Sequence, residues 1–384
     1  MKSLNINFKN FQAQKKKLHI KKNLDKILKQ KNYVIDSLKK NFKYNFDKKK
    51  ISEFNKFKNF RIIGIGGSSL GTHAIYDFLK HKIKKKFIFV NNLENTEKFD
   101  NKNKFINLIV SKSGNTLETI INANILIKKK DKNIFITENK KSYLFLLAQK
   151  LKSEIIHHNN YIGGRYSVLS EVGMLPSILM GLNINKFKQL NGLIKNKFFL
   201  DSLVSNVASI IFYLKQKKYN SIIINYDPKS KSLLEWYQQL VAESLGKKNL
   251  GLLPIISNMP KDNHSVMQLY LDGFKNNFFT FFFSKEQKSF TLNKKEILDS
   301  HNYLKNKNIE EILFAQKKAS ENIFLKKKIP FRSFEIKKRD EKTLGELFSF
   351  FILETILLAK ALKINPYDQP SVELIKTETK RILN

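Results

Sequence analysis

The chain contains no cysteine among its 384 residues. A disulfide framework, a cysteine-based metal site and a cysteine nucleophile are therefore excluded. The first residues, Met1 to Lys9, also lack the continuous apolar stretch that a secretory signal needs. These absences favour a cytoplasmic protein, and we expect that location.

The sequence also lacks a long apolar run that is free of charge. The stretch that comes nearest, residues 344–362, carries Glu346, Glu354 and Lys360. Each of these charges would cost about 2.5–3.5 kcal/mol near the centre of a bilayer. Because apolar side chains in this stretch recur at helical spacing, we predict a helix in a protein core and no membrane partner.

Arginine is scarce, although the net charge is +38. The basic residues are overwhelmingly lysines spread along the chain, and arginine occurs only as Arg61, Arg165, Arg332, Arg339 and Arg381. Recognition of phosphates and base edges usually favours arginine forks. The abundance of Lys, Asn, Ile and Phe is also what coding DNA rich in A and T would give. We therefore expect no nucleic-acid partner, and nucleic-acid binding stays an alternative.

Short apolar runs alternate with helical patterns over most of the chain. The first series of predicted strands covers 60–65, 87–90, 105–110, 133–137 and 154–157, with helices over 72–83, 116–129 and 142–152 between them. A second series covers 221–226, 250–256, 278–283 and 331–336. Continuous apolar strands separated by helices are typical of parallel sheets covered on both faces. The pattern predicts an α/β fold with two tandem domains.

The expected division of the chain has four parts. Residues 1–50 are rich in lysine with scattered apolar side chains, and we interpret them as a helical extension. Residues 51–190 and 191–345 form the two predicted α/β domains, and residues 346–384 are predicted C-terminal helices that complete the site. Ligands of such sheets bind beyond the carboxyl ends of the strands, where several motifs of this sequence fall.

Two segments that follow predicted strands suggest a phosphate site. In the first, Gly64-Ile-Gly-Gly67-Ser68, glycines allow a close backbone approach and Ser68 offers an N–H group and a hydroxyl. The second, Ser111-Lys-Ser-Gly-Asn-Thr-Leu-Glu-Thr119, precedes a helix, so its hydroxyls and free N–H groups meet the positive end of the helix dipole. Neither has the spacing of a dinucleotide fingerprint or a nucleotide P-loop. A small phosphorylated ligand fits better, although a packing turn and a polar helix cap remain alternatives.

A third helical segment, Gln239-Leu-Val-Ala-Glu243-Ser-Leu-Gly-Lys247, places Gln239 and Glu243 on one helix face. By itself, a Glu on an amphipathic helix is more often a solvated residue. Three more segments carry polar groups in short motifs: Gly163-Gly-Arg165-Tyr-Ser, Asp262-Asn-His264-Ser and Gln369-Pro-Ser-Val-Glu-Leu-Ile-Lys376. A lone His would likewise more often be structural.

Taken in order, these six segments resemble the phosphoglucose isomerase (glucose-6-phosphate isomerase) family. The resemblance spans roughly residues 60 to 380 and implies two sugar isomerase (SIS) domains, each a parallel sheet flanked by helices. It implies interconversion of D-glucose 6-phosphate and D-fructose 6-phosphate through a cis-enediolate, in glycolysis and gluconeogenesis. It also implies that neither a metal nor an organic cofactor is required, and that the protein is a homodimer.

The resemblance assigns roles to individual residues. It implies that Glu243 is the base, that Arg165 stabilises the enediolate, and that His264 opens the sugar ring with Lys376, with His264 acting across the subunit interface. The residues implied to bind the substrate are Gly67, Ser68, Ser111, Lys112, Ser113, Thr116, Thr119, Gln239 and Gln369. The sequence departs from the family pattern at Leu245, at Ser113-Gly-Asn115 and at Pro370-Ser371.

Two other functions remain possible from the sequence. One is the isomerase half of a glucosamine-6-phosphate synthase, but its usual ammonia source is a cysteine-dependent glutaminase and this chain has no cysteine. The other is a non-catalytic sugar-phosphate sensor that keeps only the phosphate loop. A sensor would need none of the four residues Glu243, Arg165, His264 and Lys376.

Overall fold

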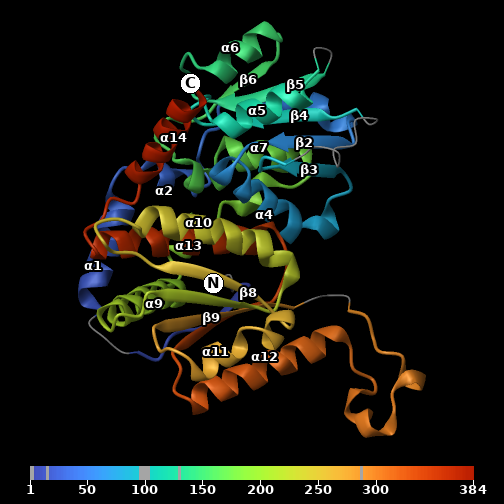
Figure 1. Cartoon of the computed structure of the whole chain (residues 1–384), viewed down its shortest axis with the longest axis vertical. Coiled ribbons are helices and arrows are strands. Elements are labelled where there is room, and N and C mark those ends of the chain that lie inside the picture. Colours follow the sequence, from blue (N-terminus) through green and yellow to red (C-terminus); the bar gives the residue numbers. More distant parts are fainter. Residues whose placement is uncertain (1–3, 14–16, 95–103, 129–130, 286–288) are drawn as a thin grey trace.

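The computed structural model describes residues 4–13, 17–94, 104–128, 131–285 and 289–384. It contains two sheets of five strands each, stacked along the long axis of the molecule with helices between and around them (Figure 1). The first sheet has the order β3-β2-β4-β5-β6 and the second β1-β10-β9-β7-β8. The predicted α/β fold with two parallel sheets is confirmed.

The first sheet is parallel throughout. Its strands are β2 (Asn59–Ile63), β3 (Lys86–Val90), β4 (Ile106–Val110), β5 (Lys132–Thr137) and β6 (Glu154–His157). All five lie where the apolar runs predict strands. β4 is buried along its whole length, which explains why four of its five residues are apolar, and the amide of the fifth, Asn107, is hydrogen-bonded to Asn133.

The second sheet has four parallel strands and one antiparallel edge strand. Its strands are β1 (Ile6–Lys9), β7 (Asn220–Asn225), β8 (Leu253–Asn258), β9 (Asn277–Ser284) and β10 (Phe331–Ile336). The prediction that residues 1–50 are helical is wrong for Ile6–Lys9. This segment alternates buried and exposed side chains, and its inward side chains Ile6 and Phe8 belong to the main hydrophobic core, where Phe8 packs against Phe334 and Phe350.

The helices of the chain lie on the faces of both sheets and between them. They are α1 (Leu18–Lys29), α2 (Tyr33–Ser37), α3 (Lys48–Ser52), α4 (Leu70–Phe78), α5 (Leu117–Leu126), α6 (Tyr143–Lys150), α7 (Glu171–Leu179), α8 (Leu190–Leu193), α9 (Lys197–Lys215), α10 (Lys231–Leu245), α11 (Met267–Asp272), α12 (Ile309–Lys326), α13 (Glu341–Ala361) and α14 (Pro370–Leu383).

The helix α13 confirms the core helix predicted over 344–362. Its residues from Thr343 to Ala359 are all buried, and it lies with α10 between the two sheets (Figure 1). The predicted boundary between residues 345 and 346 therefore falls inside a continuous helix, whereas the rest of the division stays a prediction. In the described part of the chain, one helix, α9, has the length and composition of a membrane span, and 56% of its apolar window is buried inside the structure.

Candidate active site

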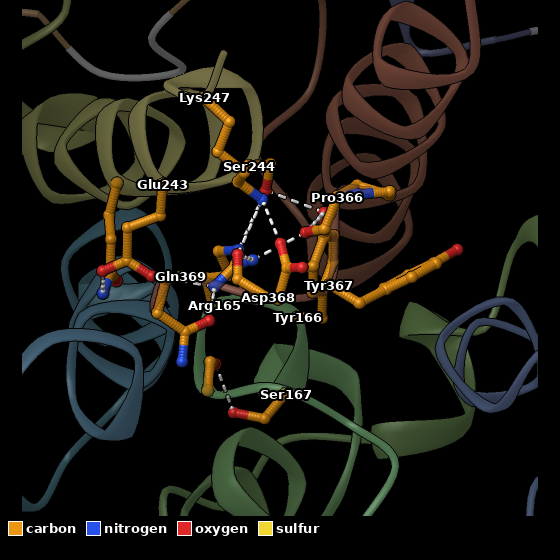
Figure 2. A network of polar contacts seen from close by, with 12 residues as sticks. Arg165, Tyr166, Ser167, Glu243, Ser244, Lys247, Pro366, Tyr367, Asp368 and Gln369 are labelled. Carbon is orange, nitrogen blue, oxygen red and sulfur yellow. Dashed lines mark hydrogen bonds and ion pairs between the residues drawn. The ribbon is translucent and has the colours of Figure 1, made fainter. Parts of the chain in front are cut away.

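Arg165 is the centre of the site and is almost completely buried. It lies on a short 3-10 helix (Gly164–Leu169) that follows the Gly163-Gly164 turn. Its Nε donates to Ser244 Oγ at 2.9 Å, and its Nη1 donates to Glu243 Oε2 at 3.0 Å and to Gln369 Oε1 at 2.8 Å. The residues come from three separate parts of the chain and meet around one guanidinium (Figure 2).

The remaining Arg165 donors contact the backbone between α13 and α14. Its Nη2 donates to the carbonyl oxygens of Pro366 at 2.6 Å and Asp368 at 3.1 Å. A guanidinium has five N–H groups, so each has an acceptor within the protein. Its charge stays at the site, but a direct hydrogen bond to a substrate requires Gln369 or Glu243 to release Nη1.

Both oxygens of the Glu243 carboxylate are engaged. Oε2 accepts from Arg165, and Oε1 accepts from Gln239 Nε2 at 2.8 Å. The spacing of four residues on α10 places Gln239 and Glu243 side by side, as the sequence predicts. The Glu243 side chain is 30% exposed, whereas its neighbours Trp236 and Leu240 are fully buried. Glu243 therefore lies at the rim of the core, with its carboxylate held and still open to a ligand.

The glycine turn after β2 packs directly against this cluster. A Cβ atom on Gly66 would lie 2.8 Å from Gln239 Nε2, and one on Gly67 would lie 2.2 Å from the carbonyl carbon of Gly164. Only a residue without a side chain fits at Gly67 without displacing the backbone that leads to Arg165. Ser68, which follows in the same turn, is half-buried.

The second predicted phosphate segment follows the neighbouring strand, β4. Because β2 and β4 are parallel neighbours, their carboxyl ends meet at one edge of the sheet. A Cβ atom on Gly64 would lie 2.7 Å from the Val110 carbonyl oxygen, so the two segments touch. A line of contacts thus runs from the loop after β4, through the Gly64–Gly67 turn, to Gln239 and Glu243.

The loop after β4 is shaped by its own polar contacts. Ser111 Oγ and Thr116 Oγ1 are hydrogen-bonded at 2.8 Å, and Ser113 Oγ accepts from the Asn115 N–H at 3.2 Å. Gly114 has φ +66°, and a Cβ there would lie 2.0 Å from Ser142 Oγ. The buried Thr119 Oγ1 has no hydrogen-bond partner within the described chain. Lys112, which is expected to contribute a positive charge to phosphate binding, forms an ion pair with Glu138, with 3.4 Å between Lys112 Nζ and Glu138 Oε1.

Among the described residues, neither of the two remaining predicted residues has a hydrogen bond or ion pair with the Arg165 cluster. His264 ends a short 3-10 helix (Lys261–His264) after β8 and is exposed to solvent. Lys376 is exposed on α14, and its Nζ pairs with Glu373 Oε1 at 2.7 Å. The structure thus brings Glu243, Arg165, Gln239 and Gln369 together, whereas the roles of His264 and Lys376 stay predictions.

Tyr166, Ser244 and Lys247 lie within the sequence motifs, but the sequence predicts no role for them. The Tyr166 hydroxyl contacts Ser244 Oγ at 2.8 Å and donates to the Pro366 carbonyl at 3.1 Å. Burial raises the pKa of Tyr166 to about 12, so it stays a protonated donor. Their positions next to Arg165 or close to Glu243 in the motifs are the feature of the sequence that could have indicated a role in the site.

Comparisons with known proteins find similar sequences over most of the chain. Residues 12–251, more than half of the chain, match the family model described as phosphoglucose isomerase. The chain is 35% identical over 352 residues to a glucose-6-phosphate isomerase of Mycoplasmopsis pulmonis, covering 84% of this chain and 82% of the relative. It is 32% identical over 349 residues to a glucose-6-phosphate isomerase of Methanocaldococcus jannaschii, covering 86% and 84%.

Solved structures show the same fold. A hypothetical protein of Thermus thermophilus superposes with a TM-score of 0.82 at 20% identity, over 96% of this chain and 94% of the other. A glucose-6-phosphate isomerase of Chlamydia trachomatis superposes with a TM-score of 0.75 at 18% identity, over 95% and 83%. From the family match and the extent of these sequence similarities, we conclude that the chain belongs to the phosphoglucose isomerase family.

Proposed function

We propose that the chain interconverts D-glucose 6-phosphate and D-fructose 6-phosphate through a cis-enediolate, a reaction of glycolysis and gluconeogenesis. The observation that carries the proposal is the contact between the Glu243 carboxylate and the Arg165 guanidinium, beside the glycine turn. An aldose–ketose isomerisation needs one base that moves a proton between adjacent carbons and one cation near the developing oxyanion. This pair supplies both groups in a chain of the appropriate family.

In this mechanism, Glu243 removes the proton from C2 of open-chain glucose 6-phosphate and returns it to C1, while the proton of the C2 hydroxyl passes to the C1 oxygen, which becomes the C1 hydroxyl of fructose 6-phosphate. Arg165 lies next to the same carboxylate, so its charge is close to the oxygens on which negative charge develops. Gln239 and Gln369 orient Glu243 and Arg165 and offer amide groups to the sugar hydroxyls. These contacts hold the proposed base and the cation next to each other.

The phosphate of the substrate is assigned to the edge where β2 and β4 end. The residues proposed to bind it there are Gly67, Ser68, Ser111, Lys112, Ser113, Thr116 and Thr119. The unpartnered hydroxyl of Thr119 supports this assignment, since a buried donor needs an acceptor. Lys112 would have to exchange its contact with Glu138 for one with the phosphate.

The reaction itself is tested with the purified full-length chain and fructose 6-phosphate. We expect glucose 6-phosphate to form, measured by its oxidation with NADP⁺ and a coupling dehydrogenase. The same mixture without the chain is the control and should give no product signal, because the coupling dehydrogenase oxidises glucose 6-phosphate and not fructose 6-phosphate. If fructose 6-phosphate binds in calorimetry without turnover, the chain is a sugar-phosphate sensor and the proposed activity is wrong.

We further propose that the protein acts in the cytoplasm as a homodimer, with His264 of one subunit opening the sugar ring in the site of the other. Two features support this arrangement: His264 is exposed on its own subunit, and α14 has no buried residue. The side chains of Leu374, Ile375 and Ile382 on α14 are 70–72% exposed. Exposed apolar side chains on a helix next to the site are what a partner subunit would cover.

Sharing of His264 predicts complementation between two inactive variants. Glu243→Gln and His264→Ala proteins, mixed under conditions that exchange subunits, should regain up to about a quarter of wild-type activity. The mixed dimer holds one site with both native groups, and about half of the dimers are mixed if exchange is random. Activity of the unmixed variants is the control. Mixed dimers that form, as seen by native mass spectrometry, but stay inactive would show that His264 is not shared.

A further inference from the structure

Residues 365–369 form the last part of the connection between α13, which ends at Ala361, and α14, which begins at Pro370. Its last residue, Gln369, accepts a hydrogen bond from Arg165 Nη1 at 2.8 Å, and its first residue, Asn365, lies four residues after the end of the buried helix α13. The segment therefore determines where Gln369 lies and in which direction α14 leaves the core. The contacts that hold this segment in place therefore also hold Gln369 at Arg165.

Besides Arg165, Lys247 is the side chain that donates most hydrogen bonds to this segment. Its Nζ donates to the Asn365 carbonyl at 2.5 Å, to the Asp368 carbonyl at 2.6 Å and to Asp368 Oδ1 at 2.9 Å. An ammonium group has three donors, and these three acceptors match them. The Lys247 side chain, whose contacts are drawn in Figure 2, is only 13% exposed, so it is ordered by these contacts, in contrast to the many solvated lysines of this chain.

Lys247 follows the end of α10, the helix that carries Glu243. Its contacts therefore connect the element that holds the proposed base to the segment that carries Gln369. The helix α14, which begins immediately after Gln369, has no buried residue of its own in the described chain. Within one subunit, its placement depends on how its first residues are held.

We propose that Lys247 is a positioning residue for the isomerisation, which latches residues 365–369 to the end of α10 and so holds Gln369 and α14 at the Arg165–Glu243 pair. This inference rests on the proposed function, because it assigns Lys247 a part in that reaction. Lys247 does not contact the Glu243 carboxylate itself; it acts through Asp368 and Asn365.

The hydrogen bonds predict that loss of the Lys247 side chain has a larger effect than loss of the Asp368 side chain. Two of the three acceptors of Lys247 are backbone carbonyls, which no substitution at residue 368 removes. The hydrogen bond from Lys247 also lowers the pKa of Asp368, so this carboxylate stays ionised at neutral pH. Loss of Lys247 should therefore cost more activity than Asp368→Ala, which removes only the third contact.

The first test measures kinetics with fructose 6-phosphate. Lys247→Ala is expected to lower kcat/KM about 10–100-fold, because three charge-assisted hydrogen bonds are lost. Propylammonium, which has the size and charge of the deleted atoms, should restore part of that loss, whereas 1-propanol should not. Lys248→Ala is the matched control, since Lys248 is adjacent and exposed, and it should leave kcat/KM unchanged.

The second test needs no substrate. Hydrogen exchange of backbone amides from Tyr367 to Lys376 should become faster in Lys247→Ala, while exchange in α13 should remain as in the wild type. Unchanged exchange in this segment, or wild-type kcat/KM, would overturn the latch, and so would faster exchange in α13 that indicates general loosening. A wild-type protein that is inactive with fructose 6-phosphate would instead overturn the proposed function, so the two failures are distinguishable.

Discussion

Replacing Glu243 by Gln should lower kcat about 10²–10⁴-fold, the range that a general acid–base group contributes. Gln has the same shape and keeps an oxygen that can accept the Arg165 Nη1 hydrogen bond, so the cluster around Arg165 is retained. Its amide cannot accept a proton from C1 of fructose 6-phosphate or, in the reverse direction, from C2 of glucose 6-phosphate. The expected result is therefore a loss of turnover with little change in the affinity for fructose 6-phosphate.

The matched control lies on the same helix. Glu235 is 34% exposed against 30% for Glu243, and it also pairs with a cation, since its Oε1 lies 3.6 Å from Lys231 Nζ. Glu235→Gln makes the same chemical change two turns away and should leave kcat unchanged. A second measurement follows the uptake of solvent deuterium at C1 and C2 of the sugar. This exchange should disappear with Glu243→Gln, and near-native turnover or exchange would remove Glu243 from the role of base.

Breaking the buried ion pair between Arg332 and Glu354 should have the largest effect on stability. Both side chains are fully buried between β10 and α13, and Arg332 Nη1 and Nη2 both donate to the Glu354 carboxylate. Arg332 Nε also donates to Thr280 Oγ1 at 3.0 Å, and the Tyr237 hydroxyl donates to Glu354 Oε2 at 3.2 Å. Glu354→Ala leaves an uncompensated guanidinium in the core, which should cost about 3–5 kcal/mol of unfolding free energy.

The comparison that tests this explanation is a double substitution. Arg332→Met together with Glu354→Leu removes both charges and should recover most of the stability lost in Glu354→Ala, since a buried pair contributes little net stability relative to apolar residues of similar size. Glu235→Ala, which breaks the exposed pair with Lys231, should cost at most about 1 kcal/mol. Urea unfolding followed by circular dichroism measures all three. A double variant as unstable as Glu354→Ala would show that packing, and not the unpaired charge, causes the loss.

The strands and helices could be predicted well because their signals are local. β4, β6, β9 and β10 appear as short apolar runs, and each lies within a few residues of its predicted limits. The core position of α13 followed from apolar side chains that recur at helical spacing. β1 was missed because its four residues lie in a lysine-rich stretch, and only pairing with β10, more than 300 residues later, makes it a strand.

The candidate site was only partly predictable. The pairing of Gln239 with Glu243 follows from their spacing on one helix, and the adjacency of the loops after β2 and β4 follows from a parallel sheet. The contacts of Arg165 with Ser244 and Gln369 do not follow from any local pattern. They join segments that are 79 and 204 residues apart in the sequence.

The amino-acid sequence by itself determined the family, the α/β class and the candidate base, because motifs and periodicity are properties of neighbouring residues. Only the tertiary structure decided that every N–H of Arg165 has a protein acceptor and that Lys247 holds residues 365–369. Hydrogen bonds and ion pairs act over a few ångströms. Their partners are therefore fixed by how distant segments pack, which the spacing of residues along the chain does not specify.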